Sequence, residues 1–446
     1  MNDDGRDDVI EVTAVRPANG GEVVAHHEGR VVFVRGAIPG ERVRARITDD
    51  RHVGYLRAEM VEVLDASPFR TPVACAAAAH GGGCCDLSFV DVAHMRDLKA
   101  QVLTDVLTRI GGLTTEGIDA VSSADLVTAL DDDPTGWRIR TRLGVDADGR
   151  AGVRAFHGSE VIAGYQCIQP APSMLAGLDD LAATPGSDLA VVTDMTGARH
   201  VVEVAPAARR SGTNQRGTNQ RGTNRGGRDR RRAAQKDRRA REQHRATRVL
   251  EGDQYAAHAV GERIWRIPVT GFWQAHRAAP STYSAAISAM LADVEVPTNP
   301  VAWDLYGGAG VFAAALLDSS TSAAAVHVVD SDAGALQAAA DTFADDGRIV
   351  LHHGEVAASL ADLPTSDVVV ADPPRTGAGE RVVSAIVDAH PAAVVLVGCD
   401  AGRFARDLAL FARGDYRVVA LQGFDAFPQT HHVEAIACLV PGRAPS

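Results

Sequence analysis

The C-terminal part of the chain, from about residue 266 onward, alternates short apolar runs with helical segments. Such an alternation predicts an α/β fold with one open, mostly parallel sheet. Only residues 425–431 separate the last two runs, too few for a helical crossover, so these two should form an antiparallel hairpin. The seven predicted strands of this sheet are residues 301–306, 325–330, 348–352, 367–372, 393–399, 416–424 and 432–440.

The N-terminal part, residues 1–65, has a different pattern of short alternating runs. Apolar and polar residues alternate over residues 22–26, 30–34 and 42–47, and turn signals at residues 19–21 and 39–40 separate these runs. Closely spaced short strands predict an OB-like β-barrel, which is a common binding surface for single-stranded nucleic acid. The alternative is a β domain that only packs against its neighbour.

The middle part, residues 66–265, mixes both patterns and predicts an α+β central domain. Residues 90–110 have helical periodicity, and residues 138–145 and 152–157 have the pattern of strands. Between residues 207 and 248 the chain repeats Gly-Thr-Asn-Gln-Arg and has almost no apolar side chain, so it cannot bury a core. We expect the first half of this insert to be disordered. Its Arg-rich second half either becomes helical on RNA or is a solvated linker.

Charge and composition change this picture in one respect. The 446 residues carry a net charge of −12, yet residues 209–248 hold 15 Lys and Arg against three acidic residues. A basic segment in an acidic chain indicates a local contact with a polyanion, and we expect that partner to be RNA. No apolar run is long enough to cross a membrane, the first residues are acidic, and six cysteines do not make a disulfide scaffold. We therefore expect a cytoplasmic monomer, with no membrane or protein partner.

A glycine-rich turn follows the first predicted strand of the C-terminal sheet. Its residues are Asp-Leu-Tyr-Gly-Gly-Ala-Gly at 304–310, ahead of a helix at 311–317. Glycines there let the backbone approach a nucleotide-like ligand at the carboxyl ends of the strands. Asp330 ends the next strand, where a carboxylate can accept hydrogen bonds from ribose hydroxyls. The alternative role for Asp330 is a helix N-cap, which Ser331 or Asp332 could equally supply.

Three more chemically reactive side chains should reach the same edge of the sheet. Asp372 ends the fourth strand in Asp-Pro-Pro-Arg at 372–375, Cys399 ends the fifth strand, and Glu434 begins the last one. Since the last strand runs backwards, its start lies beside the ends of the parallel strands, and the topology gathers these residues. A thiol and a carboxylate together fit covalent catalysis with a nucleophile and a base. The alternative for Cys399 is a small buried apolar side chain.

At these residues the chain resembles the RNA uracil-C5 methyltransferases. The resemblance rests on Asp-Pro-Pro-Arg-Thr-Gly at 372–377, on Cys399, and on Phe-Asp-Ala-Phe-Pro-Gln-Thr-His-His-Val-Glu at 424–434. Residues 271–274 look like the family's segment whose glutamine contacts S-adenosylmethionine, and residues 8–65 look like a TRAM domain. The resemblance implies the class I, Rossmann-like methyltransferase fold for residues 266–446. Around the cysteine the family favours Tyr-x-Ser-Cys-Asn-x-x-Thr, and this chain keeps only the cysteine.

The resemblance implies transfer of a methyl group from S-adenosyl-L-methionine to C5 of a uridine in tRNA or rRNA. Cys399 would attack C6 of the base, and Glu434 would remove the C5 proton. The cofactor would be bound by Gln274, Tyr306, Asp330 and Asp372, and the RNA by Arg375 and by Phe272, stacked on an unstacked uracil. Two alternatives stay open. One is a catalytically silent RNA-binding protein, suggested by the altered motif around Cys399, and the other is a methyltransferase that acts on a nitrogen.

Four cysteines in the middle part bear on a second cofactor. Relatives with a [4Fe–4S] cluster use Cys-x5-Cys-x2-Cys and a distant fourth cysteine, and Cys75, Cys84 and Cys167 match three of these positions. The other position is Gly81, and Cys85 could replace it only if the loop is rebuilt. Because four thiolates are the normal requirement, the ligand set for a cluster is incomplete. The alternative is a set of reduced structural cysteines.

Overall fold

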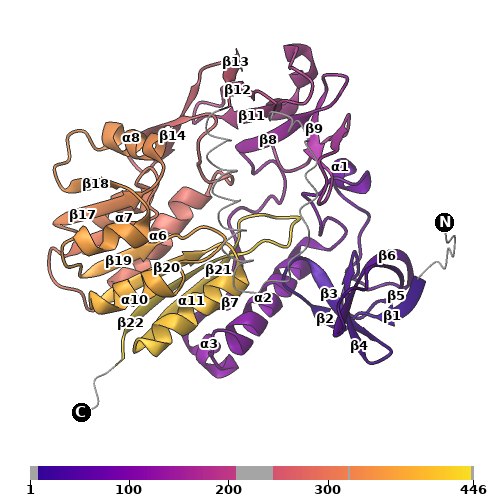
Figure 1. The fold of residues 1–446 in the computed structure, drawn as a ribbon, viewed down its shortest axis with the longest axis horizontal. Coiled ribbons are helices and arrows are strands. Elements are labelled where there is room, and N and C mark those ends of the chain that lie inside the picture. Colours follow the sequence, from indigo (N-terminus) through magenta and orange to yellow (C-terminus); the bar gives the residue numbers. More distant parts are fainter. Residues whose placement is uncertain (1–8, 207–244, 320–321, 443–446) are drawn as a thin grey trace, which may run out of the picture.

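The computed structural model describes residues 9–206, 245–319 and 322–442, which are arranged around three large β-sheets (Figure 1). Most of the insert predicted at 207–248, up to position 244, lies outside the described residues. None of the helices in the described ranges is long and apolar enough to cross a bilayer.

The N-terminal strands are β1 (Val9–Thr13), β2 (Arg16–Pro17), β3 (Glu22–His27), β4 (Arg30–Arg35), β5 (Arg42–Asp49) and β6 (Tyr55–Asp65). They form one sheet in the order β1-β5-β6-β4-β3-β2. Side chains that include Val12, Val32 and Val43 fill a small apolar core of their own. The predicted turns are present, with φ of 100° at Gly20 and 91° at Gly40, a conformation that glycine adopts without strain. The sheet curls so that β1 contacts β3, and a closed OB-like barrel stays a prediction.

The middle of the chain forms a second six-stranded sheet and a separate hairpin. The strands of the sheet are β8 (Arg140–Val145), β9 (Ala151–Arg154), β10 (Val161–Ala163), β11 (Asp188–Thr193), β12 (Arg199–Val204) and β13 (Thr247–Glu251). The hairpin is β14 (Tyr255–Val260) with β15 (Arg263–Pro268). Strands β8 and β9 confirm two predicted runs. The predicted end of the insert at 248 is wrong, because β13 already pairs with β12 and Arg245 binds the carboxylate of Asp188.

The third sheet holds the predicted α/β core. Its strands are β16 (Val301–Leu305), β17 (Ala325–Asp330), β18 (Ile349–His353), β19 (Val368–Ala371), β20 (Ala393–Gly398), β21 (Tyr416–Asp425), β22 (Glu434–Pro441) and β7 (Ser122–Ala129). The order is β18-β17-β16-β19-β20-β22-β21-β7. Strands β16 to β20 are parallel, and β22 runs antiparallel to both β20 and β21, which confirms the predicted hairpin.

The predicted number of seven strands is one short. Strand β7, which lies within the middle part of the sequence, extends the sheet by pairing parallel to β21. The segment 66–265 therefore contributes to the same sheet as residues 301–441, and the boundaries between the three predicted domains stay predictions.

Helices cover both faces of this sheet (Figure 1). The longer ones are α2 (Val92–Arg109), α3 (Thr115–Val121), α6 (Ala279–Ala292), α7 (Val311–Asp318), α8 (Ala333–Thr342), α10 (Glu380–Asp388) and α11 (Ala401–Arg413), and the short ones are α1 (Ala76–Ala79), α4 (Pro172–Leu175) and α9 (Val356–Ser359). Neighbouring strand residues face opposite layers: Val368 and Val370 pack with α6, α7 and α8, while Val369 packs with α2, α10 and α11. Continuous apolar strands suit such a sheet because both of its faces are buried.

Candidate active site

The glycine turn after β16 leaves room for a ligand at the carboxyl edge of the sheet. Tyr306, Gly308 and Gly310 have φ of 60°, 54° and 79°, all in the left-handed region. A Cβ built on Gly310 would lie 2.9 Å from the ring of Phe343, whereas a Cβ on Gly308 would meet nothing within 4 Å. The backbone at Gly308 is therefore open, while Tyr306 holds a conformation that costs roughly 1–3 kcal/mol for a residue other than glycine.

Asp330 lies beside this turn and is hydrogen-bonded to its backbone. Its carboxylate accepts backbone hydrogen bonds from Gly308 at 2.9 Å and from Asp332 at 2.7 Å. The N-cap of α8 is Asp332, whose side chain accepts from the backbone of Gly334 and Ala335. The N-cap alternative for Asp330 is therefore wrong. Each of its oxygens keeps a further acceptor site for a ligand hydroxyl.

A buried carboxylate that sequence analysis did not single out lies below the turn. Asp304 is fully buried; its Oδ2 accepts from the backbone N–H of Ala313, and its Oδ1 has no hydrogen-bond partner among the described residues. Burial, aided by the nearby charges of Asp372 and Asp330 and opposed by the hydrogen bond from Ala313, raises the pKa of Asp304 to about 7. Like charges this close disfavour ionisation, so the edge of the sheet favours a cationic ligand.

The strand register brings Cys399 and Glu434 together. Gly398 of β20 pairs with Ala435 of β22 in antiparallel register, so the next residue on β20, Cys399, lies opposite the preceding residue on β22, Glu434. On the other side of β20, Ala371 of β19 pairs in parallel with Leu396. Asp372, one residue beyond Ala371, therefore lies at the same edge.

Burial and neighbouring carboxyl groups raise the pKa values of the side chains at this edge of the sheet. The pKa of Glu434 rises to about 8, mainly because the side chain is buried and further because of Asp372, while Arg375 opposes the shift. Burial also raises the pKa of Asp372 to about 7 and that of the Cys399 thiol to about 12, where Glu434 and Asp372 add to the effect. A carboxyl group with a pKa near neutral is well placed to act as a general base or acid.

Tyr283 is a second residue that sequence analysis missed. It lies on α6, is fully buried, and its hydroxyl has no hydrogen-bond partner among the described residues. Its pKa is raised well above the ordinary value, first by burial and then by Glu434, Asp372 and Cys399. The sequence around Tyr283 gives no sign that its hydroxyl lies near Glu434 and Cys399, because only the packing of α6 against the sheet brings it to this edge.

The segment with Phe272 and Gln274 is held in place from the central sheet. Arg140 of β8 donates to the backbone oxygens of Val269 at 2.8 Å and Gly271 at 2.6 Å. Phe272 is 70% exposed and Gln274 is partly exposed, and between them Trp273 is buried against the ring of His258. Phe272 is thus free to stack on a base. The predicted RNA contact Arg375 is also exposed.

The loop that leads into Glu434 is tied to the middle part of the chain. Lys99 of α2 forms a buried ion pair with Asp425 and donates to the backbone oxygen of Phe427 at 3.1 Å. Asp86 accepts from both the backbone and the ring of His431. Because a buried ion pair is costly to break, these contacts hold the entry to β22 in one position.

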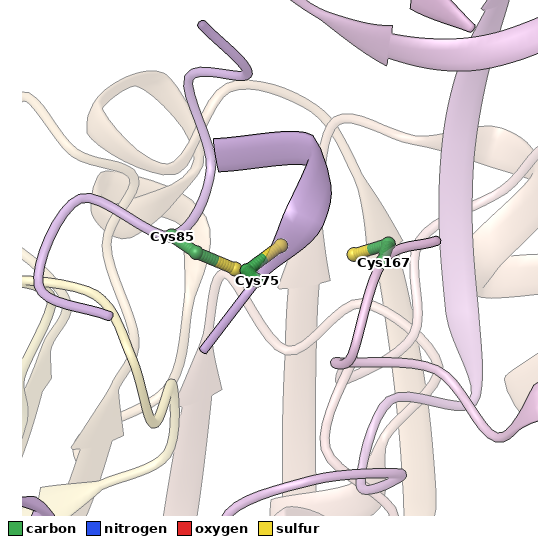
Figure 2. Close-up of side chains that lie close together, drawn as sticks. All are labelled: Cys75, Cys85 and Cys167. Carbon is green, nitrogen blue, oxygen red and sulfur yellow. The ribbon is translucent and has the colours of Figure 1, made fainter. Parts of the chain in front are cut away.

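The cysteines of the middle part meet in space, with one difference from the prediction. The Sγ atoms of Cys75, Cys85 and Cys167 lie within 4.8 Å of one another (Figure 2). The sequence favoured Cys84 over Cys85, but Cys85 joins this group, and the Sγ of Cys84 lies 3.8 Å from that of Cys85. In the described ranges all of these cysteines are free thiols.

Comparison with known proteins decides the family. A TRAM-domain model matches residues 7–61. An uncharacterized RNA methyltransferase of Corynebacterium glutamicum is 39% identical over 443 residues, which cover 97% of this chain and 97% of the relative. A 23S rRNA (uracil(1939)-C(5))-methyltransferase of Shewanella piezotolerans is 25% identical over 95% of this chain and 94% of its own length. The chain belongs to the RNA uracil-C5 methyltransferase family.

A solved structure has the same fold as this chain. It is the tRNA (uracil-54, C5)-methyltransferase of Pyrococcus abyssi in complex with S-adenosyl-L-homocysteine. Its TM-score is 0.66 at 17% identity, and the match covers 96% of this chain and 100% of that one. The match extends over all three sheets, so the class I methyltransferase fold of the C-terminal part is confirmed.

Packing accounts for part of the altered motif around the methyltransferase's cysteine. A Cβ at Gly398, where the family favours serine, would lie 2.7 Å from the ring of Phe404, so glycine accommodates this phenylalanine. Asp400, where the family favours asparagine, caps α11 by accepting from the backbone N–H of Arg403 at 2.9 Å. Aspartate and asparagine are equivalent as N-caps. These substitutions keep the backbone that presents Cys399.

The raised pKa of Glu434 predicts how the stability of the ligand-free methyltransferase depends on pH. The folded protein keeps the proton up to a pKa of about 8, whereas the unfolded chain loses it near the ordinary value of 4.5, so stability falls as pH rises through that window. Glu434→Gln removes this loss. We expect the melting temperature of the variant, relative to the parent, to be higher near pH 9 than near pH 5. Calorimetry measures it, with Glu262→Gln in the exposed β14–β15 turn as control; a difference that does not change with pH rejects the prediction.

Proposed function

We propose that the chain methylates C5 of a uridine in tRNA or rRNA, with S-adenosylmethionine as methyl donor, Cys399 as nucleophile and Glu434 as base. The observation that carries the proposal is the antiparallel register of β20 and β22, which sets the thiol opposite the carboxyl group. Both groups lie at the sheet edge where β16 also ends in the glycine turn, and ligands of open α/β sheets bind at this edge.

The chemistry of uracil explains why these two groups are needed. C5 is a poor nucleophile, and addition of the Cys399 thiolate to C6 places an electron pair at C5 as an enolate. When bound, S-adenosylmethionine would supply the methyl group, which C5 would take from the sulfonium, with S-adenosylhomocysteine as the leaving group. Glu434 then takes the proton from C5, the C5–C6 double bond re-forms, and the Cys399–C6 bond breaks to release the thiolate. Atoms and charge balance over the cycle, and the proton leaves through Glu434.

The carboxyl groups at this edge of the sheet fit both the attack by Cys399 and the removal of the proton by Glu434. Cys399 is a neutral thiol in the ligand-free protein because burial and two carboxyl groups raise its pKa to about 12. A cation at this edge offsets the charges of Asp304, Asp330 and Asp372 and so lowers the pKa of the thiol. Glu434, with a pKa of about 8, can accept a proton and return it to solvent near neutral pH.

Several residues fit S-adenosylmethionine at the glycine turn. The open backbone at Gly308 and the unpartnered Oδ1 of the buried Asp304 leave space and unused acceptor capacity there. We assign the cofactor contacts to Gln274, Tyr306, Asp330 and Asp372, with Asp330 as the acceptor for the ribose hydroxyls.

Asp330→Asn should weaken S-adenosylmethionine binding about ten- to a hundredfold, since charge-assisted hydrogen bonds of about 1.5–3 kcal/mol are lost. Asparagine keeps an acceptor for the backbone N–H of Gly308, so the turn is preserved better than with alanine. Titration calorimetry measures the affinity. Asp332→Asn is the matched control, because asparagine caps α8 as well as aspartate does. Equal affinities for all three proteins would remove Asp330 from the site.

RNA recognition is assigned to exposed groups around the edge. Phe272 is available to stack on the flipped uracil, and Arg375 is available to contact RNA. The TRAM match at residues 7–61 adds a β surface of the kind that binds single strands.

Nucleoside analysis tests the proposed function. Purified protein is incubated with methyl-labelled S-adenosylmethionine and with RNA from a strain that lacks the gene, and the RNA is digested and separated by mass spectrometry. We expect 5-methyluridine as the labelled nucleoside. Label on a nitrogen would indicate the alternative methyltransferase reaction, and RNA binding without label would indicate a silent RNA-binding protein.

A further inference from the structure

The loop that carries Cys84 and Cys85 is built for close packing. A Cβ at Gly82 would lie 2.7 Å from the backbone oxygen of Ala77, and one at Gly83 would lie 2.7 Å from the backbone of Phe156. The backbone N–H of Gly83 donates to the oxygen of Arg154 at 3.0 Å. These glycines let the loop lie against α1 and β9 and bring Cys85 close to Cys75. The loop therefore has the conformation that Cys85 needs in order to replace the missing ligand at Gly81.

The spacing of the thiols does not fit a [4Fe–4S] cluster. In such a cluster each thiolate binds a different iron, so the four sulfurs surround the whole cube and are held far apart. The Sγ atoms of Cys75, Cys85 and Cys167 instead lie within 4.8 Å of one another. Gly81, at the family's second ligand position, is exposed and has φ of 94°, a conformation that cysteine rarely adopts.

The spacing fits a single metal ion. A zinc ion bound at about 2.3 Å by four thiolates puts neighbouring sulfurs about 3.8 Å apart across the tetrahedron. The Sγ atoms of Cys75, Cys85 and Cys167 form the close group, and the Sγ of Cys84 lies outside it but 3.8 Å from that of Cys85, which makes Cys84 the candidate for the fourth ligand. We propose that Cys75, Cys84, Cys85 and Cys167 bind one zinc ion as a structural tetrathiolate site.

Charge around the site supports four thiolates. Zinc with four thiolates carries two net negative charges, and the guanidinium of Arg138 is near enough to Cys167, Cys84 and Cys85 to interact with their charges. Arg138 donates to Gln169 at 2.9 Å and to the backbone oxygen of Arg140, and among the described side chains no carboxylate pairs with it. A partly buried cation without an acidic partner is accounted for by an anionic metal site beside it.

The segment that carries the cysteines also contacts the loop that leads into Glu434. Asp86 and Leu87 follow Cys85 directly; Asp86 binds His431, and the backbone N–H of Leu87 donates to the oxygen of Gln429 at 3.1 Å. On the other side, Arg138 lies 5.9 Å from the ring of Phe427. Zinc therefore fixes the segment against which residues 427–431 pack, and this part of the inference rests on the proposed role of Glu434.

Metal content tests the site without RNA or methyl transfer, so its outcome is separate from that of the proposed function. The full-length protein is purified without oxygen from cells supplied with both zinc and iron, and metals and acid-labile sulfide are quantified. We expect one zinc per chain, little iron and no visible absorbance, and replacement by Co²⁺ should give the intense d–d bands of a tetrahedral thiolate site. Iron with sulfide, no metal, or a disulfide between any two of the four cysteines would each overturn the proposal.

Variants locate the ligands. Cys75→Ser, Cys84→Ser, Cys85→Ser and Cys167→Ser should each lose or weaken zinc binding, while Cys438→Ala, a change at a buried cysteine of β22, should retain it. Full zinc binding in Cys84→Ser would overturn the four-thiolate set. If a ligand variant does not fold, release of zinc from the parent protein is followed with a thiol-blocking mercurial and a colorimetric chelator. Hydrogen exchange then compares the zinc-loaded and zinc-free parent. Faster exchange at residues 425–434 in the zinc-free protein supports the link to the loop, and unchanged exchange overturns it.

Discussion

Cys399→Ala is expected to abolish methyl transfer, with a loss of about 10⁴-fold or more, because no addition to C6 can occur without the thiolate. The same change should abolish covalent capture of RNA. With 5-fluorouridine in place of uridine, methylation proceeds but fluorine cannot leave as a proton, so the parent protein stays attached to the RNA. A denaturing gel detects this complex, which should form with the parent and be absent with Cys399→Ala.

Two control measurements test whether the loss is specific to the thiol of Cys399. Cys438→Ala removes a thiol that is buried in the middle of β22, away from the sheet edge, and should trap RNA like the parent. Calorimetry should show that Cys399→Ala still binds S-adenosylmethionine. A covalent complex that persists in Cys399→Ala would show that another group is the nucleophile.

Glu434→Gln is expected to accumulate the covalent intermediate on ordinary uridine. Addition and methyl transfer do not need the base, but removal of the C5 proton does, and loss of a general base costs roughly 10²–10⁴-fold in rate. The trapped complex should therefore appear on a denaturing gel without any fluorinated base. Glutamine has nearly the volume of glutamate, so the packing of the buried start of β22 is kept.

The double variant Cys399→Ala, Glu434→Gln is the control for this accumulation and should give no complex. If Glu434→Gln turns over normally, another group removes the proton. Asp372 is then the first candidate, because it lies at the same edge and also has a pKa raised to about 7.

The sequence predicted which residues meet at this edge of the sheet because strand ends can be predicted from their apolar runs. Strand β17 has the predicted bounds, and β16, β19 and β20 end within one residue of them. Because parallel strands end at the same edge of a sheet, strand ends predicted this closely are enough to expect Asp330, Asp372 and Cys399 at one edge. The short hairpin connection adds Glu434 to them. The assignment of roles to these residues came from the family motifs rather than from the strand pattern.

The residues that the sequence did not reveal depend on contacts between distant segments. Tyr283 has no motif around it and becomes part of the edge only through the packing of α6. Strand β7 has few β-branched residues, and its position is set by β21 rather than by its own propensity. The convergence of Cys85 with Cys75 and Cys167 depends on how closely Gly82 and Gly83 pack, which cannot be predicted from the spacing of the cysteines in the sequence.

The pairing of β7 with β21 has a consequence for how the chain folds during synthesis. Thr128 and Gly423, which contact each other across these strands, are 295 residues apart. Since loop closure must precede a pairing of this range, β7 cannot join its sheet until the ribosome has synthesised the chain through β21. Until then β7 and the face of α2 that packs on it remain uncovered, and a fragment that starts at residue 266 would expose the edge of β21. We therefore infer that β7 is the last strand to join this sheet, and that its pairing with β21 connects two segments that lie far apart in the sequence.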